Sequence, residues 1–234
     1  LLPELSKLLA RLPVQDDGEA LRQSLFHSGT HFNPDLLTSE AERRARLEGV
    51  HAALDRAESL VFLDTESTGG RNGRLIEVAL VETDVEQNVT GGLHFRCNPH
   101  RRSLAGARRV HGIQDCELEH CPEFAARADE LLEAVRGKTV VIHDRTMDLL
   151  WLNRELQAAR PGAPRFEDRC TVVDSFVLAR AIPSERRRNG LDALLEWYGL
   201  GARGGHHDAY GDAALLSRVF FELWWDLDEW LYGE

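Results

Sequence analysis

The chain has 234 residues, 43% of them hydrophobic, and a formal net charge of −11. This is enough apolar material for one α/β domain of good size with an additional segment. The negative charge argues against a protein that coats nucleic acid, although it is compatible with an enzyme that binds only a few nucleotides. No apolar run approaches the roughly 18 residues of a membrane-spanning helix.

The start of the sequence and its cysteines predict a cytoplasmic protein. No positively charged stretch followed by an apolar run stands at the start, so we expect no secretory signal, and the absence of an initial Met is consistent with a trimmed chain. The four cysteines form no CxxC pair, and Cys116, His120 and Cys121 do not have the spacing of the usual zinc sites. We therefore expect reduced thiols.

The first part of the chain differs in pattern from the rest. Residues 1–58 predict an N-terminal helical extension that packs on, or is tethered to, a core domain over residues 59–234. Residues 1–12 have helical apolar spacing. A second helix is predicted after Thr38 or Ser39, either of which can serve as the N-cap before acidic residues. Its apolar positions are Leu47, Val50 and Leu54.

From residue 59 on, the pattern predicts an α/β fold. The first strand connection carries three glycines, so we expect the first three strands to form an antiparallel meander. The later strands alternate with helices, which indicates a mixed five-stranded sheet flanked by helices. Strand patterns cover residues 60–64, 74–84, 91–97, 138–144 and 170–175. Helical patterns cover residues 121–137, 147–160, 176–182, 190–199 and 212–227.

Two carboxylates follow the first buried strand segment. Asp64 and Glu66 are two residues apart in an extended segment, so both side chains point to the same face. Two unpaired carboxylates side by side repel each other, and a divalent cation removes that repulsion. Oxygen ligands of this kind suit magnesium or manganese. A solvated loop after a strand is the alternative, because a DxE motif alone is weak evidence for a metal site.

Two further segments place polar residues at element boundaries. Asp148 opens the helix that follows the fourth strand, and Asp212 lies in the first turn of the last helix. His207 precedes Asp212 by five residues in a glycine-rich approach. Taken singly, each acid is explained as a helix cap or a first-turn acid, and His207 as a loop histidine. Together with Asp64 and Glu66, they suggest a shared site.

These segments resemble the motifs of the DEDD exonucleases, specifically the DEDDh branch, which has the ribonuclease H-like fold. The first motif, DxE, matches DTE at 64–66. The second, HN-x-x-F-D, matches HDRTMD at 143–148, and the third, H-x-A-x-x-D-A, matches HDAYGDA at 207–213. The segment VHGIQD at 110–115 is similar to a loop that carries a substrate-contacting histidine. The resemblance extends over residues 59 to about 224.

Two positions depart from the family pattern. Asp144 stands where the family usually has Asn, which predicts altered contacts near the 3′ nucleotide. Met147 replaces the usual Phe and exchanges an aromatic packing residue for a flexible one. The spacing to Asp212 excludes the tyrosine branch and selects His207 as the base, because His206 is one residue out of register.

The resemblance implies a two-metal site. Two divalent cations, Mg2+ or Mn2+, would be held by Asp64, Glu66, Asp148 and Asp212, with Asp64 in contact with both. His207 is implied as the general base that takes the proton from the attacking water. All five residues are therefore expected to be catalytic.

The resemblance also implies a substrate. Within the branch, the segments are most similar to the proofreading epsilon subunits of bacterial DNA polymerase III. A metal-dependent 3′–5′ exonuclease of this kind removes nucleoside 5′-monophosphates from single-stranded or frayed DNA 3′ ends, in proofreading or repair, with a replication or repair protein as its partner. The expected substrate-binding residues are Thr65, His111, Asp144 and Met147.

Two other functions remain open from the sequence. Relatives of the family include RNA-trimming enzymes, so a 3′–5′ exoribonuclease is one alternative. A non-catalytic binding module of a replication or repair complex is the other, although the intact acidic positions and His207 argue against it. Metal-dependent turnover of a 3′-labelled oligonucleotide distinguishes an enzyme from such a module.

Overall fold

The computed structural model of the protein describes residues 39–233, so the helix expected over residues 1–12 lies outside the described residues. None of the helices between residues 39 and 233 combines the length and apolar character that a membrane-spanning helix requires.

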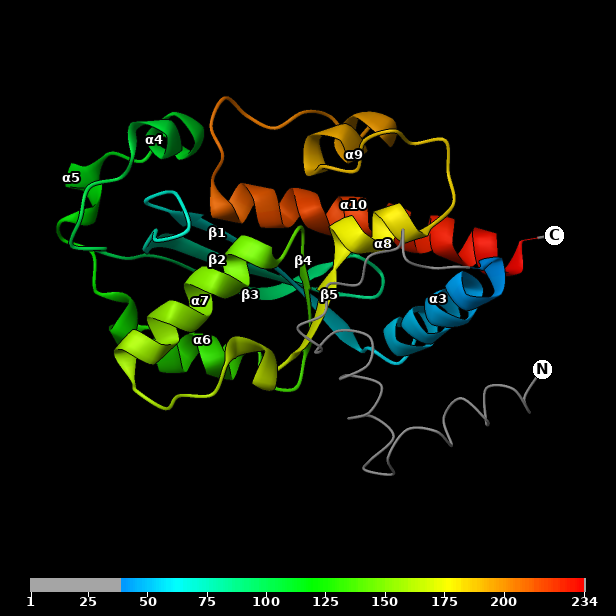
Figure 1. The fold of residues 1–234 in the computed structure, drawn as a ribbon, viewed down its shortest axis with the longest axis horizontal. Helices are drawn as coiled ribbons and strands as arrows, with labels where there is room; N and C mark the ends of the chain where they lie inside the picture. Colours follow the sequence, from blue (N-terminus) through cyan, green and yellow to red (C-terminus); the bar gives the residue numbers. More distant parts are fainter. Residues whose placement is uncertain (1–38, 234) are drawn as a thin grey trace.

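Five strands form one mixed sheet at the centre of the molecule. They are β1 (Ser59–Ser67), β2 (Leu75–Asp84), β3 (Val89–Arg96), β4 (Thr139–Ile142) and β5 (Thr171–Asp174). Their order across the sheet is β3-β2-β1-β4-β5 (Figure 1). The pairs β1–β2 and β2–β3 are antiparallel, whereas β1–β4 and β4–β5 are parallel. The predicted meander and the mixed five-stranded sheet are therefore confirmed.

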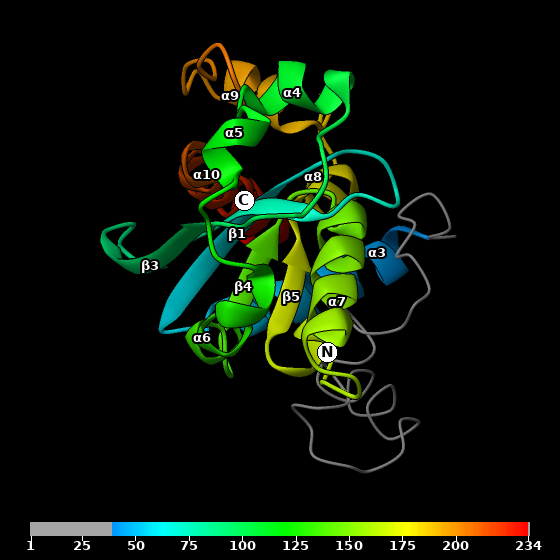
Figure 2. The same ribbon diagram turned by 90° about the vertical axis from the view of Figure 1, so that its left-hand side faces the viewer.

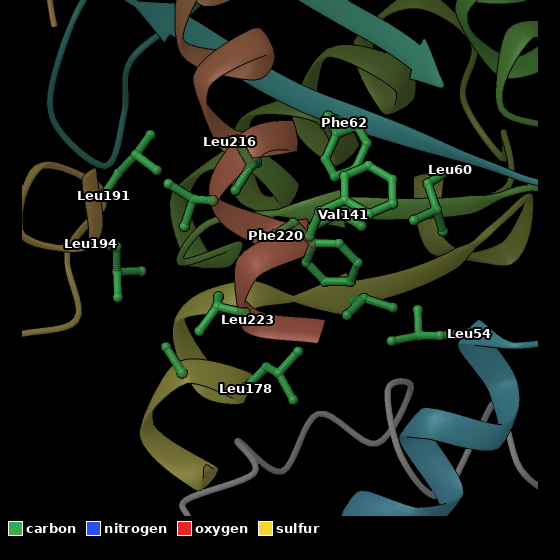
Figure 3. Packing of buried hydrophobic residues seen from close by; sticks show 14 of the residues in the cluster. Leu54, Leu60, Phe62, Val141, Leu178, Leu191, Leu194, Leu216, Phe220 and Leu223 are labelled. Atoms are coloured by element: carbon green, nitrogen blue, oxygen red, sulfur yellow. The ribbon is translucent and has the colours of Figure 1, made fainter. Parts of the chain in front are cut away.

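One face of the sheet packs against the helices that begin and end the described chain. Phe62 of β1 and Val141 of β4 contribute to a buried cluster with Leu54, Leu178 and Phe220 from the surrounding helices (Figure 3). Alternation along the strand explains the two faces, because successive side chains point to opposite sides. The helices of this face are α3 (Glu40–Leu54), α8 (Ser175–Ala181), α9 (Leu191–Trp197) and α10 (Ala209–Tyr232).

The opposite face is covered by a second group of helices, which lie across the sheet from α10 (Figures 1 and 2). Val61 and Leu63, the neighbours of Phe62 on β1, point into this second buried cluster with Leu152 and Phe166. The elements of this face are the 3-10 helices η3 (Phe124–Ala126) and η4 (Phe166–Asp168) and the helices α6 (Ala128–Ala134) and α7 (Thr146–Ala159).

Two parts of the chain between β3 and β4 differ from the prediction. The helix expected over residues 121–137 is divided into η3 and α6, because the N–H groups of Ala126 and Arg127 bond to carbonyls three residues earlier, as in a 3-10 turn. Two short helices that the pattern did not predict, α4 (Ala105–His111) and α5 (Asp115–Leu118), connect β3 to this region.

Helix α3 is part of the core. The Ser39 side chain accepts a hydrogen bond from the N–H of Glu42, which confirms one of the two predicted N-caps. Leu47, Val50 and Leu54 are buried in the cluster that includes α10. The described part of the predicted extension therefore packs on the central sheet and on α10, while the division of the chain at residue 58 stays a prediction.

We expect Leu54→Ala to lower the free energy of unfolding by about 2–5 kcal/mol, because it removes a fully buried side chain and leaves a cavity. Val89→Ala is the control, since Val89 is 63% exposed and Leu54 only 1%. The control should change stability by less than about 0.5 kcal/mol. Chemical denaturation measures both variants, and equal effects would contradict the packing of α3.

Candidate active site

Four acidic side chains from three elements meet at one end of the sheet. Asp64 and Glu66 lie two residues apart on β1, so both leave the strand on the same side. Asp148 lies in the first turn of α7, and Asp212 in the first turn of α10. Burial, and then the charges of Asp148, Glu66 and Asp212, raise the pKa of Asp64 well above its usual value. The structure thus brings the four predicted carboxylates together.

The parallel pairing of β1 and β4 explains how α7 reaches the site. Leu63 pairs with Ile142, the last residue of β4, so the chain leaves β4 at the same edge where Asp64 lies. A hydrogen bond then fixes the acid of α7, since the Thr65 hydroxyl donates to Asp148 Oδ1 at 2.7 Å. Two neighbouring residues of β1 therefore build the site. Asp64 supplies a carboxylate, and Thr65 supplies the donor that orients the Asp148 carboxylate.

The pKa values of the other three acids are raised as well, and burial is the first cause in each case. Burial and the charges of Asp212, Glu77 and Asp148 raise the pKa of Glu66 to about 8. Burial raises the pKa of Asp148 to about 7, although the hydrogen bond from Thr65 lowers it. Burial also raises the pKa of Asp212, against the positive charges of Arg203 and His207. Each shift indicates a site in which additional positive charge is stabilising.

The donor atoms fit a divalent cation. Single ligand atoms of Glu66, His207 and Asp212 all lie within 4.8 Å of one another. Carboxylate oxygens are the ligands that magnesium and manganese prefer, and imidazole is compatible with several transition metals. This donor set contains two of the four predicted ligands, Glu66 and Asp212, and adds His207, which was predicted as the base. Metal binding by all four carboxylates therefore stays a prediction.

The predicted base lies beside these acids. The His207 ring is 37% exposed, and its Nδ1 is 3.3 Å from Asp212 Oδ2. The backbone N–H of His207 donates to the carbonyl of Val110 at 2.9 Å. This hydrogen bond holds the loop that precedes α10 against the end of α4. The exposed His206 packs instead over Gly112, where an added Cβ would lie 2.8 Å from His206 Cγ. It is the His207 ring that reaches Asp212, in agreement with the predicted register.

The predicted substrate-binding residues fall into two groups. Thr65 and His111 are buried, whereas Asp144 is exposed and Met147 is partly buried in the first turn of α7. His111 Nδ1 accepts from the N–H of Ile113, while its Nε2 is buried without a hydrogen-bond partner among residues 39–233. Contacts of all four with a substrate stay predictions.

The backbone at Asp144 explains one departure from the family pattern. Asp144 has φ = 56°, in the left-handed region that most side chains avoid. Asn and Asp tolerate this conformation better than other non-glycine residues. The exchange of Asn for Asp at this position therefore keeps a backbone that the loop requires, while it adds a negative charge.

Comparison with known proteins decides the family. A family model described as Exonuclease matches residues 61–220. The DNA polymerase III subunit epsilon of Rickettsia felis is 34% identical over 168 residues, which cover 70% of this chain and 72% of that protein. The chain belongs to the exonuclease family. It is a 3′–5′ exonuclease, as the resemblance predicted, and the family generally uses divalent metal ions.

Two solved structures share the fold of this exonuclease. The exonuclease I of Methylocaldum szegediense superimposes with a TM-score of 0.56 at 20% identity, over 73% of this chain and 40% of that chain. A 3′-exonuclease that recognises the 3′ end of histone mRNA stem-loops superimposes with a TM-score of 0.60 at 14% identity, over 73% and 83% of the two chains. The ribonuclease H-like fold is thus confirmed.

Glu77 is an important residue of the exonuclease that sequence analysis missed. It is 1% exposed, and its carboxylate accepts from Arg96 Nε at 2.8 Å and from the N–H of Ala209 at 3.0 Å. Burial alone raises its pKa, but these hydrogen bonds and one with His94 outweigh burial and lower it. Because Ala209 is the first residue of α10, Glu77 fixes the start of the helix that carries Asp212. The sequence signal that could have identified Glu77 is its position as the single acid in the apolar segment LIEVALV.

Asp174 was also missed. It ends β5 and caps α8, accepting from the N–H of Phe176 at 3.0 Å, and it also accepts from the N–H of Asp144 at 3.2 Å. Its charge helps to raise the pKa of Asp148. The signal was the same as for Asp64, since a carboxylate follows an apolar strand in TVVD.

Arg203 is the third missed residue. Its Nη1 lies 2.8 Å from Asp212 Oδ2, and its Nε lies 2.8 Å from Asp192 Oδ1. No periodic pattern predicts the position of an arginine in a glycine-rich loop, so only the folded chain reveals this contact.

Chelator-treated exonuclease should lose stability as the pH rises from 4.5 to about 8. Glu66 has a folded pKa of about 8 against 4.5 for its usual value, so the folded chain binds more protons than the unfolded chain in this window, and the free energy of unfolding falls. Asp64→Asn should be more stable than wild type at pH 8, because it removes a charge from the cluster.

Thermal melts in chelator, followed across this pH window, measure the effect. Glu86→Gln is the control, since Glu86 is an exposed acid in the turn between β2 and β3, and it should follow the wild-type curve. A wild-type stability that is constant or increases over this window would contradict the cluster.

Proposed function

We propose that the protein is a metal-dependent 3′–5′ exonuclease that removes nucleoside 5′-monophosphates from single-stranded or frayed DNA 3′ ends, in proofreading or repair. The observation that carries the proposal is the convergence of four carboxylates with raised pKa values beside His207. The similarity to a relative named as a subunit of DNA polymerase III supports DNA as the substrate and a replication or repair protein as the partner.

The four carboxylates would hold the metal. Asp64, Glu66 and Asp212 would form one set of ligands, and Asp64 with Asp148 would form a second set. Mg2+ or Mn2+ ions held there would polarise the phosphodiester and lower the pKa of the attacking water. The chain contributes the alignment of these ligands, through the hydrogen bonds of Thr65 to Asp148 and of Ala209 to Glu77.

His207 would act as the general base. A ring nitrogen removes the proton of the water that attacks the terminal phosphodiester, and the bond to the leaving 3′ oxygen then breaks. The contact between the His207 backbone and Val110 holds the ring at the mouth of the site. His111 directly follows Val110 in α4. This proposed substrate contact therefore lies next to the residue that binds the His207 backbone.

The remaining substrate contacts would lie on the second motif. Asp144 is exposed and Met147 is partly buried, whereas Thr65 is buried and donates to Asp148. The four free cysteines support a cytoplasmic location, because reduced thiols are the rule there.

An exoribonuclease is the second candidate. One structural neighbour is a 3′-exonuclease that recognises a histone mRNA stem-loop, so RNA is the alternative substrate to test. A non-catalytic module is disfavoured, because the four acids and His207 are assembled in one place.

A nuclease assay distinguishes these candidates. We expect Mg2+ or Mn2+ to support the stepwise release of 5′-monophosphates from single-stranded DNA that is labelled at its 5′ end. Chelator should abolish this release. Matched RNA and fully paired DNA should be cleaved more slowly. Asp64→Ala should be inactive but folded, since it removes a ligand and relieves repulsion. Turnover in chelator would refute the mechanism, and faster cleavage of RNA would select the second candidate.

His207→Ala should lower kcat by roughly 10²–10⁴-fold, the usual contribution of a general base. His206→Ala is the matched control, because His206 neighbours His207 but packs over Gly112, and its effect should be mild. Steady-state kinetics on single-stranded DNA measures both. A severe defect in His206→Ala with a nearly silent His207→Ala would show that the register of the third motif is wrong.

A further inference from the structure

A positively charged side chain occupies the edge of the carboxylate cluster. Arg203 lies in the glycine-rich loop between α9 and α10, which leads to the start of α10 (Figure 1). Its side chain is only 15% exposed, and its Nη1 is 2.8 Å from Asp212 Oδ2, the oxygen that also faces His207. The guanidinium therefore interacts with a carboxylate that the proposed function assigns to the metal.

The same nitrogen contacts the proposed base. Arg203 Nη1 is 2.6 Å from His207 Nδ1 and 3.1 Å from Nε2. Only the ring nitrogen without a proton can accept from the guanidinium N–H, and while it does so its lone pair cannot take a proton from water. In this arrangement Arg203 contacts Asp212, a proposed metal ligand, and His207, the proposed base, at the same time.

The charge of Arg203 partly balances the negative charge of the carboxylates. It opposes the rise in the pKa of Asp64, Glu66 and Asp212 that burial and mutual repulsion cause. A guanidinium and a divalent cation both stabilise these carboxylates, and the Asp212 Oδ2 atom that a metal would bind already has Arg203 Nη1 at 2.8 Å and His207 Nδ1 at 3.3 Å. The two cations therefore compete for the same oxygen.

The surroundings of Arg203 allow it to move outward. Its Nε contacts Asp192 Oδ1 at 2.8 Å, and Asp192 is 72% exposed on α9, so an ion partner lies on the solvent side. Gly201, two residues before Arg203, has φ = +95°, and an added Cβ at Gly201 or Gly205 would meet nothing within 4 Å. The loop is thus not held by close packing at these positions.

We propose that Arg203 competes with the metal. Its guanidinium holds Asp212 and His207 until a divalent cation displaces it from both, and it then keeps Asp192 as its ion-pair partner. Arg203 thereby sets the metal concentration at which the base is released and the site becomes active. This inference rests on the proposed function, because it concerns the same carboxylates and the same base.

Calorimetric titration of the full chain with MnCl2, without nucleic acid, tests the competition. Arg203→Gln should bind Mn2+ roughly tenfold more tightly than wild type, because the metal no longer has to break a charge-assisted hydrogen bond. Arg203→Lys keeps the charge and should lie between them. Arg188→Gln is the matched control, since Arg188 is an exposed arginine that pairs with Glu196 on α9, and its affinity should equal that of wild type.

Thermal melts provide a second measurement that is independent of activity. Arg203→Gln should melt below wild type in chelator and gain more from Mn2+ than wild type does, which also establishes that the variant is folded. In the nuclease assay, its half-maximal Mn2+ concentration should fall while its KM for DNA stays unchanged.

Three outcomes would overturn the inference. Unchanged or weaker Mn2+ binding by Arg203→Gln would exclude competition and leave the proposed function intact. A raised KM for DNA with unchanged metal affinity would make Arg203 a substrate contact instead. The absence of Mn2+ binding in wild type as well as in the variants would refute both the inference and the metal-dependent function.

Discussion

The mutual repulsion of four carboxylates at one end of the sheet is the constraint around which the molecule is arranged. Asp64 and Glu66 are fixed on the central strand β1, and the parallel strand β4 leads the chain back to the same edge, where α7 presents Asp148. The last helix adds Asp212. Such a cluster destabilises the metal-free protein, but it concentrates the oxygen ligands that a divalent cation prefers.

The surrounding structure opposes this repulsion at defined points. Glu77 is buried with lowered pKa, and it fixes the start of α10 through the N–H of Ala209, so it supports the position of Asp212 from inside the sheet. Thr65 donates to Asp148. Arg203 adds a positive charge from a loop. The first two contacts are buried and belong to the framework, whereas Arg203 lies at the rim, where a competing cation can replace it.

The sequence predicted the elements whose signal is local. Alternating apolar residues located the strands, Ser39 marked the start of α3, and carboxylates after apolar strands indicated the site. Contacts between distant segments were not predictable in this way. The link from Glu77 to α10 joins residues 132 positions apart, and the place of Arg203 depends on the path of a loop without periodicity. The division of the helix over 121–137 depends likewise on a local 3-10 turn.

Anomalous diffraction at the manganese edge, from crystals grown with Mn2+ and a nucleoside 5′-monophosphate, would locate the metal ions. We expect two manganese peaks beside Asp64, one shared with Glu66 and Asp212 and the other with Asp148. We also expect that the Arg203 guanidinium has left Asp212. Manganese bound away from Asp64 would refute the two-metal site, and manganese bound at Asp212 with Arg203 still in contact with that carboxylate would refute the competition.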